Sequence, residues 1–217
     1  MSSPLHKVLE VRFLTPQCFR LTVERRGLDF IPGQCVNIGL PGAGVNREYS
    51  SYSSASDRET LGFLIRLVEG GDVSSRLASR KPGDLVEIHG AYGSFVLPSP
   101  VPEKADFIFL ATGTGIAPFH SFVKSHPGLR YRLIHGVRHL NERYDRETYE
   151  SGRYFACVSQ EPGGDFHGRL TAYLATQIPH PTATYYLCGN RAMIVEAYEL
   201  LREQGVNGDR LVTEVFF

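Results

Sequence analysis

The chain has 217 residues, of which 42% are hydrophobic and 21% charged, a composition typical of a globular protein with one large or two small domains. Its 23 basic and 23 acidic residues cancel, so no net charge draws it to nucleic acid or to an anionic membrane. No apolar run approaches the roughly 20 residues of a membrane helix, and the N-terminal segment lacks the pattern of a secretory signal.

The first hundred residues predict an all-β unit. Short runs rich in β-forming residues alternate with Pro-Gly and Gly-Gly turns, at 7–13, 19–24, 34–39, 48–54, 61–68 and 85–89. One short helix is predicted over 74–79, with Ser74 or Ser75 as its cap. Strands of this length and spacing indicate an antiparallel barrel or sandwich, which we expect to occupy residues 1–99.

The second half predicts an α/β unit. Residues 98–104 (PSPVPEK) form a proline-rich linker, and strands then alternate with helices. The expected strands are 107–111, 131–136, 154–158, 184–188 and 211–215, and the expected helices are 116–124, 171–177 and 192–204. Continuous apolar strands separated by helices indicate a parallel sheet, over residues 104–217.

The four cysteines, Cys18, Cys35, Cys157 and Cys188, stand apart from one another. Zinc and iron–sulfur sites need clustered ligands, so we expect no metal. Isolated cysteines are typical of a reducing compartment, which favours a cytoplasmic protein.

A glycine-rich segment, residues 113–118 (GTGIAP), follows the first apolar strand of the second half. Glycines at such a turn let a pyrophosphate approach backbone N–H groups at a helix N-terminus. Pro118 stands where the usual fingerprint has its third glycine, so a plain strand-to-helix turn is the alternative. The candidate nucleotide-binding residues are Gly113, Thr114 and Gly115.

A polar strand begins with residues 47–50 (REYS). Arg47 offers a bidentate fork for a phosphate, and Tyr49, two residues on, could stack on a flat ring from the same strand face. Ser50 could bond to a ring heteroatom, and Glu48 is included in the same candidate cofactor site. The alternative is an exposed barrel strand with a solvated arginine and a half-buried tyrosine.

Residues 71–77 (GDVSSRL) form a glycine turn into a short helix. The backbone N–H groups of Val73, Ser74 and Ser75 could hold a second phosphate position. An ordinary capped helix is the alternative.

Residues 187–190 (LCGN) place a strand end before a helix. The carboxyl ends of parallel strands line the ligand crevice of such sheets. The small thiol of Cys188 and the glycine at Gly189 would admit a flat nicotinamide, and Asn190 belongs to the same candidate site. The alternative is that Cys188 is one more small buried hydrophobe.

The chain ends in residues 213–217 (TEVFF). Phe216 and Phe217 could anchor a terminal strand or cover a planar cofactor.

Together and in this order, the five motifs resemble the ferredoxin/flavodoxin–NADP(H) reductase family, in particular its bacterial branch, whose chains end in Thr-Glu-x-aromatic-aromatic. The resemblance covers essentially the whole chain. It implies an FAD-binding antiparallel barrel followed by an NAD(P)-binding α/β domain, with tightly bound FAD and with NADP(H) as a substrate.

On the flavin side, the resemblance implies that Arg47 holds the FAD pyrophosphate, Tyr49 stacks on the isoalloxazine and Ser50 lies near its N5. The backbone of residues 73–75 would cradle phosphate.

On the nicotinamide side, the resemblance implies that Thr114 and the Cys188–Gly189 pair shape the slot. Glu214 would contribute to proton handling, and the terminal aromatic pair would sit against the flavin or its adenine. Ser50, Cys188 and Glu214 are thus the candidate catalytic residues.

The choice between NADPH and NADH depends on basic side chains. Relatives that prefer NADPH often carry Ser-Arg-Glu where this chain has Ser159, Gln160 and Glu161. Arg138 and Arg169 match basic positions that could bind the 2′-phosphate, so we expect NADPH to be preferred, with NADH possible.

The resemblance implies hydride transfer between NADP(H) and FAD, and single electrons passed to or from ferredoxin or flavodoxin. The alternatives are a reductase component of an oxygenase system, a free flavin reductase, a non-catalytic electron-transfer subunit and an unliganded binding module. The sequence leaves open the electron acceptor, the physiological direction and the oligomeric state.

Overall fold

The computed structural model describes residues 4–216, which fold into two compact units. The first unit comprises the residues up to Leu97 together with 117–127, and the second comprises 98–116 and the residues from Gly128 onward. No helix among these residues is long and apolar enough to span a membrane.

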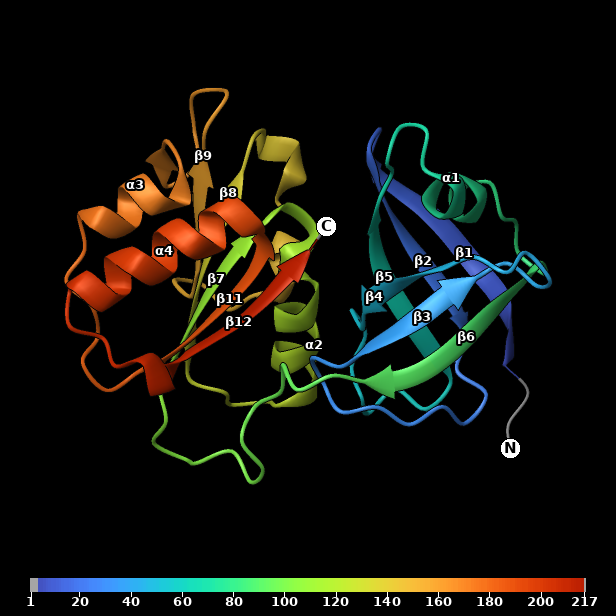
Figure 1. The fold of residues 1–217 in the computed structure, drawn as a ribbon, viewed down its shortest axis with the longest axis horizontal. Coiled ribbons are helices and arrows are strands. Elements are labelled where there is room, and N and C mark those ends of the chain that lie inside the picture. The colour runs from blue at the N-terminus through green and yellow to red at the C-terminus, as the bar shows by residue number, and fades with distance from the viewer. Residues whose placement is uncertain (1–3, 217) are drawn as a thin grey trace. The chain divides into compact units, whose positions relative to one another are not determined.

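The first unit is an antiparallel sheet of six strands in the order β4-β3-β6-β1-β2-β5 (Figure 1). The strands are β1 (Leu5–Thr15), β2 (Cys18–Glu24), β3 (Cys35–Gly39), β4 (Asn46–Ser50), β5 (Thr60–Arg66) and β6 (Leu85–Tyr92). The backbone beyond β4 closes the sheet, because Ser51 bridges to Phe63 and the N–H of Tyr52 donates to the carbonyl of Gly62 at 2.8 Å. The predicted barrel is confirmed.

The barrel interior is filled by the inward side chains of its strands. Phe19, Leu21 and Val23 alternate along β2 and are fully buried, as the period of two requires. The short helix α1 (Asp72–Ala78) adds Val73 and Leu77 to the same core. The predicted serine cap of α1 is wrong: Gly71 is the N-cap, and the hydroxyl of Ser74, inside the helix, accepts the N–H of Val68 at 3.1 Å.

Helix α2 (Ala117–Ser125) packs in the first unit. His120 stacks on Tyr52 with ring centroids 3.9 Å apart and donates Nδ1–H to its carbonyl at 2.6 Å. The Ser121 hydroxyl donates to the carbonyl of Ser53, and Ser125 Oγ accepts the N–H of Ala55. The strand predicted over 48–54 therefore ends at Ser50, since residues 51–55 bond to β5 and α2 instead.

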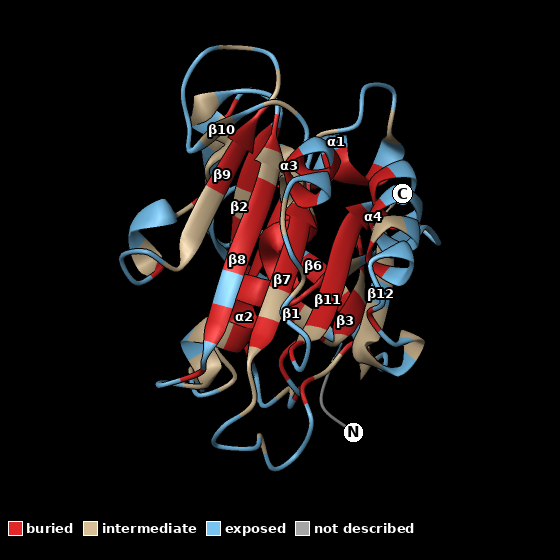
Figure 2. Ribbon diagram, turned by 90° about the vertical axis from the view of Figure 1, so that its left-hand side faces the viewer, coloured by how far each residue is buried: buried red, intermediate tan, exposed pale blue. Residues whose placement is uncertain are grey.

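The second unit is a parallel sheet in the order β10-β9-β8-β7-β11-β12. The strands are β7 (Phe107–Thr112), β8 (Tyr131–Val137), β9 (Tyr154–Val158), β10 (Phe166–His167), β11 (Thr184–Asn190) and β12 (Leu211–Phe216). Helices α3 (Leu170–Ala175) and α4 (Arg191–Glu203) pack together on the sheet and share one core with β7, β8 and β11. The central strands are mostly buried (Figure 2), as their continuous apolar runs predict.

The two-residue strand β10 and four 3₁₀ turns were not expected from the sequence. The turns are η1 (Gly113–Ile116), η2 (Leu140–Glu142), η3 (Arg146–Thr148) and η4 (Gly208–Arg210). Such short elements carry no periodicity, so only their tertiary setting reveals them.

Candidate functional site: the carboxyl ends of the parallel strands

The site in the second unit lies where the strand order reverses. β7 lies between β8 and β11. The strands that follow β7 in the chain, β8 to β10, lie on one side of it, and the last two, β11 and β12, lie on the other. Open α/β sheets bind ligands at the carboxyl ends of the strands at such a point. η1 follows β7 there, and Asn190 ends β11 beside it.

Two glycines bring the loop after β7 against the end of β11. A Cβ on Gly115 would lie 2.4 Å from the carbonyl oxygen of Cys188 and 2.6 Å from the Cα of Gly189. A Cβ on Gly189 would lie 2.4 Å from Thr112 Oγ1, and its φ of +132° disfavours any side chain. Thr112 Oγ1 also accepts the N–H of Asn190 at 3.0 Å. The structure thus joins Gly115 to Gly189, 74 residues later in the chain, through backbone that only glycine permits.

A buried histidine supports this loop from within the sheet. His135 on β8 is fully buried, with Nε2 2.9 Å from the carbonyl oxygen of Gly113 and Nδ1 2.9 Å from the hydroxyl of Tyr154. Because a carbonyl only accepts, Nε2 carries the proton and Nδ1 accepts from the tyrosine. Burial lowers the pKa of His135 to about 4, so the ring is neutral at physiological pH. Sequence reasoning missed His135, whose one signal is a histidine inside an apolar strand.

We expect His135 to make folding stability depend on pH. Its pKa falls from 6.5 to about 4 on folding, so its contribution is present above pH 6.5 and is lost as the pH falls toward 4. Between pH 7 and pH 5 it should lower the free energy of unfolding by about 2 kcal/mol, as measured by urea unfolding.

The variant His135→Gln provides the comparison. This variant should be less stable than the wild type at pH 7. Its free energy of unfolding should fall by about 2 kcal/mol less than that of the wild type between pH 7 and pH 5. If the free energy of unfolding falls equally in the wild type and the variant between pH 7 and pH 5, the pH dependence comes from other groups.

The thiol of Cys188 faces the carboxyl group of Glu214. The two residues are paired in the β11–β12 ladder, and Cys188 Sγ donates to Glu214 Oε2 at 3.9 Å. Burial, with the nearby Glu214 charge, raises the pKa of Cys188 well above its ordinary value, so the thiol remains protonated. Cys188 is therefore a small, neutral, buried side chain next to Gly189 and is not a thiolate nucleophile. The catalytic roles expected for Cys188 and Glu214 remain predictions.

The end of β11 is occupied by a helix cap. Asn190 Oδ1 accepts the N–H groups of Ala192 and Met193 at 2.9 and 3.3 Å, which caps α4. Phe216 pairs with Asn190 in the ladder, so it lies at the same edge of the sheet. Phe217 lies outside the described residues, and the roles expected for Asn190 and the aromatic pair remain predictions.

The three side chains expected at a 2′-phosphate all lie near strand ends of the same sheet. Arg138 and Gln160 follow β8 and β9, and the N–H of Gln160 donates to the carbonyl of Arg138 at 3.0 Å. Arg169 is the N-cap residue of α3. All three are exposed, and no carboxylate of residues 4–216 forms an ion pair with either arginine. This leaves both guanidinium groups able to bind an anion.

In the first unit, the REYS motif lies on β4, at one end of the strand order. Arg47 and Glu48 are exposed, and Arg47 Nη1 donates to the carbonyl of Asn46 at 2.7 Å. Tyr49 is half-buried against the barrel core, and burial raises its pKa to about 12. Ser50 is buried opposite Cys35. An exposed Arg47 and a half-buried Tyr49 fit an ordinary barrel strand as well as a cofactor site, so the flavin contacts remain a prediction.

The second phosphate motif lies on α1. Val73 and Ser74 are buried and Ser75 is exposed, so only backbone N–H groups of the first turn could meet a phosphate. Asp72 in that turn pairs with Arg76 at 2.7 Å. This cradle remains a prediction.

A closed antiparallel barrel followed by a parallel sheet with a glycine-lined loop at its switch point defines a class: two-domain oxidoreductases that use a flavin and a nicotinamide nucleotide. The oxidoreductase FAD-binding domain family matches residues 12–97, and the oxidoreductase NAD-binding domain family matches residues 109–198. The chain belongs to the ferredoxin/flavodoxin–NADP(H) reductase family.

Named relatives differ in how much of their length the chain spans. It is 32% identical to a flavodoxin/ferredoxin–NADP reductase of Shigella flexneri, over 87% of this chain and 85% of that protein. It is also 32% identical to the electron transfer component of a toluate 1,2-dioxygenase of Pseudomonas putida, over 96% of this chain but 66% of that protein.

Solved structures show the same two-unit fold. A ferredoxin NADP⁺ reductase of Neisseria gonorrhoeae with bound FAD and NADP superposes with a TM-score of 0.85 at 25% identity, covering 98% of each chain. An Amycolatopsis cytochrome P450 reductase gives 0.86 at 28% identity, over the whole of this chain and 71% of that one.

Proposed function

We propose that this flavoprotein transfers a hydride between NADP(H) and FAD and exchanges single electrons with a ferredoxin or a flavodoxin. The observation that carries the proposal is the backbone contact of Gly115 with Cys188 and Gly189 at the switch point of the parallel sheet. When bound, FAD supplies the capacity to take up a hydride and to release its electrons one at a time.

The described residues fit both nucleotides. Arg47 is exposed and has no carboxylate partner among residues 4–216, so it can bind a pyrophosphate, and Tyr49 offers a ring beside it. The absence of side chains at Gly115 and Gly189 lets the loop after β7 lie directly against the end of β11, and these two backbone segments would form one wall of a nicotinamide slot. Neutral His135 holds the Gly113 carbonyl in place, which orients the loop.

The test is an anaerobic titration of the purified protein, followed by its visible spectrum. A yellow protein that is bleached by one equivalent of NADPH, and that then reduces a ferredoxin or flavodoxin, is the expected result. A colourless protein, or a flavin that neither NADPH nor NADH bleaches, would contradict the proposal.

The preference between NADPH and NADH can be raised by one substitution. In Gln160→Arg, a guanidinium is added beside Arg138, and a charge-assisted bond to the 2′-phosphate should raise the NADPH/NADH ratio of kcat/KM about tenfold or more. Arg169→Ala should lower the same ratio.

Gln17→Arg is the matched control, because it adds the same charge on an exposed turn of the barrel. Its ratio should equal that of the wild type. Equal ratios in Gln160→Arg and wild type would place the 2′-phosphate elsewhere.

A second candidate function is the reductase component of an oxygenase system. The likeness to the Pseudomonas component and to the Amycolatopsis reductase favours it. Electron delivery would then be faster to an oxygenase or its ferredoxin than to a flavodoxin, and stopped-flow reoxidation with each acceptor compares the two.

A further inference from the structure

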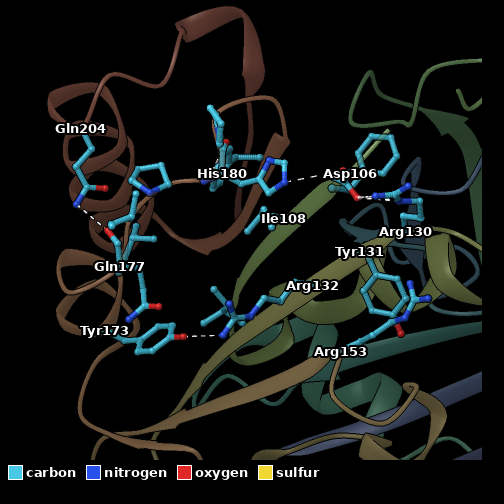
Figure 3. Close-up of a pocket in the computed structure, with 17 residues that line it drawn as sticks. Asp106, Ile108, Arg130, Tyr131, Arg132, Arg153, Tyr173, Gln177, His180 and Gln204 are labelled. Atoms are coloured by element: carbon cyan, nitrogen blue, oxygen red, sulfur yellow. Dashed lines mark hydrogen bonds and ion pairs between the residues drawn. The ribbon is translucent and has the colours of Figure 1, made fainter. Parts of the chain in front are cut away.

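A cavity of about 640 Å³ lies within the second unit, at the amino ends of the parallel strands (Figure 3). Its wall includes the start of β7 at Phe107 and Ile108, the start of β8, and Tyr185 near the start of β11. The glycine-lined loop follows the other end of β7, so the cavity and the nucleotide site lie at opposite edges of one sheet. Its volume falls within the roughly 300–1,000 Å³ of small-molecule sites.

One side of the cavity is apolar. Ile108, Ile134, Leu174 and Tyr185 contribute to its wall, and all of them belong to or pack on the core beneath α3 and α4. Ile178, in the loop between α3 and β11, also lines it and is 96% exposed. Apolar surface at a concave site favours a ligand with an apolar body.

The charges around the cavity leave one cation without a carboxylate. Arg130 pairs with Asp106 at 2.8 Å, and Arg153 pairs with Glu150 at 2.8 Å. Arg132, on β8, forms no ion pair with any carboxylate of residues 4–216.

Arg132 is also held in a fixed orientation. Its Nη2 donates to the hydroxyl of Tyr173 at 2.7 Å, as Figure 3 shows, and its guanidinium lies 5.5 Å from the ring centroid of Phe155. These contacts use one of its five N–H donors, so a fork remains for an anion. Figure 3 shows Ile108 between Arg132 and His180, so the cation and the apolar wall face the same cavity.

We propose that this cavity binds a small organic carboxylate with an apolar body. The carboxylate pairs with Arg132, and the apolar body lies on the wall formed by Ile108, Ile134 and Tyr185. The site is independent of the nucleotide chemistry at the other edge of the sheet and of the proposed function.

The isoleucine methyl groups make the test specific, because Ile108, Ile134 and Ile178 line the cavity and Ile116 lies in the loop after β7. The probe is 2-naphthoate, added to the flavin-loaded protein with labelled isoleucine methyls. Saturable shifts of the three cavity methyls with Ile116 unmoved are expected, and NADP⁺ should shift Ile116 instead. No saturable shift, or a shift led by Ile116, would overturn the proposal.

The role of Arg132 is tested with Arg132→Gln and the neutral probe 2-naphthalenemethanol. Loss of the charge-assisted pair should weaken naphthoate binding about tenfold or more and leave the alcohol unaffected. The exposed Arg146, which forms no ion pair within residues 4–216, provides the control Arg146→Gln, which should bind naphthoate as the wild type does. Equal naphthoate affinity in Arg132→Gln and wild type would contradict the assignment to Arg132.

Discussion

Gly115→Ala should lower kcat/KM for NADPH about 100-fold while leaving the bound FAD in place. The added Cβ would lie 2.4 Å from the carbonyl oxygen of Cys188, so the loop or the end of β11 must shift. Displacing a binding group by about 1 Å can cost about 100-fold in rate, because hydride transfer requires a near-attack geometry. Steady-state kinetics with NADPH and the flavin absorbance of the purified variant are the measurements.

Gly208→Ala is the matched control for this substitution. A Cβ there would come no closer than 3.5 Å to another residue, an ordinary contact, so its kinetics should match the wild type. A Gly115→Ala enzyme with unchanged kcat/KM would show that the loop does not meet the nicotinamide nucleotide.

Arg47→Ala should release FAD about 100-fold more readily while leaving the barrel folded. Arg47 is exposed, and its side chain donates a hydrogen bond to the carbonyl of the neighbouring Asn46, so the fold gains little from it. A bidentate pair of charge-assisted bonds to a pyrophosphate would contribute far more. The FAD dissociation constant and the thermal midpoint of the apoprotein separate the two effects.

Arg12→Ala removes an equally exposed arginine from β1 and should retain FAD as the wild type does. If Arg47→Ala lowers the apoprotein midpoint while FAD affinity stays constant, the residue is structural and the phosphate assignment fails.

The barrel and the sheet were both predictable because their signals are local. Residues 19–24 alternate between apolar and polar, which predicts a half-buried strand, and residues 107–111 are continuously apolar, which predicts a buried strand. Both strands form where predicted to within one residue. The cap of α1 was mispredicted because a hydroxyl near a helix start can serve another partner. Ser74 bonds to the N–H of Val68 across a turn, a contact that no spacing rule reveals.

Sequence by itself determined the two-part architecture, the order of the strands along the chain and the five motifs, since each depends on neighbours within about ten residues. Only the tertiary structure decided which motifs meet. Gly115 touches Cys188 and Gly189 because β7 and β11 are adjacent in the sheet, and strand order is a long-range property. The same holds for His135 beneath the Gly113 carbonyl and for Arg132 beside an apolar cavity. Their roles come from burial and from partners far away in the chain, which composition and periodicity do not encode.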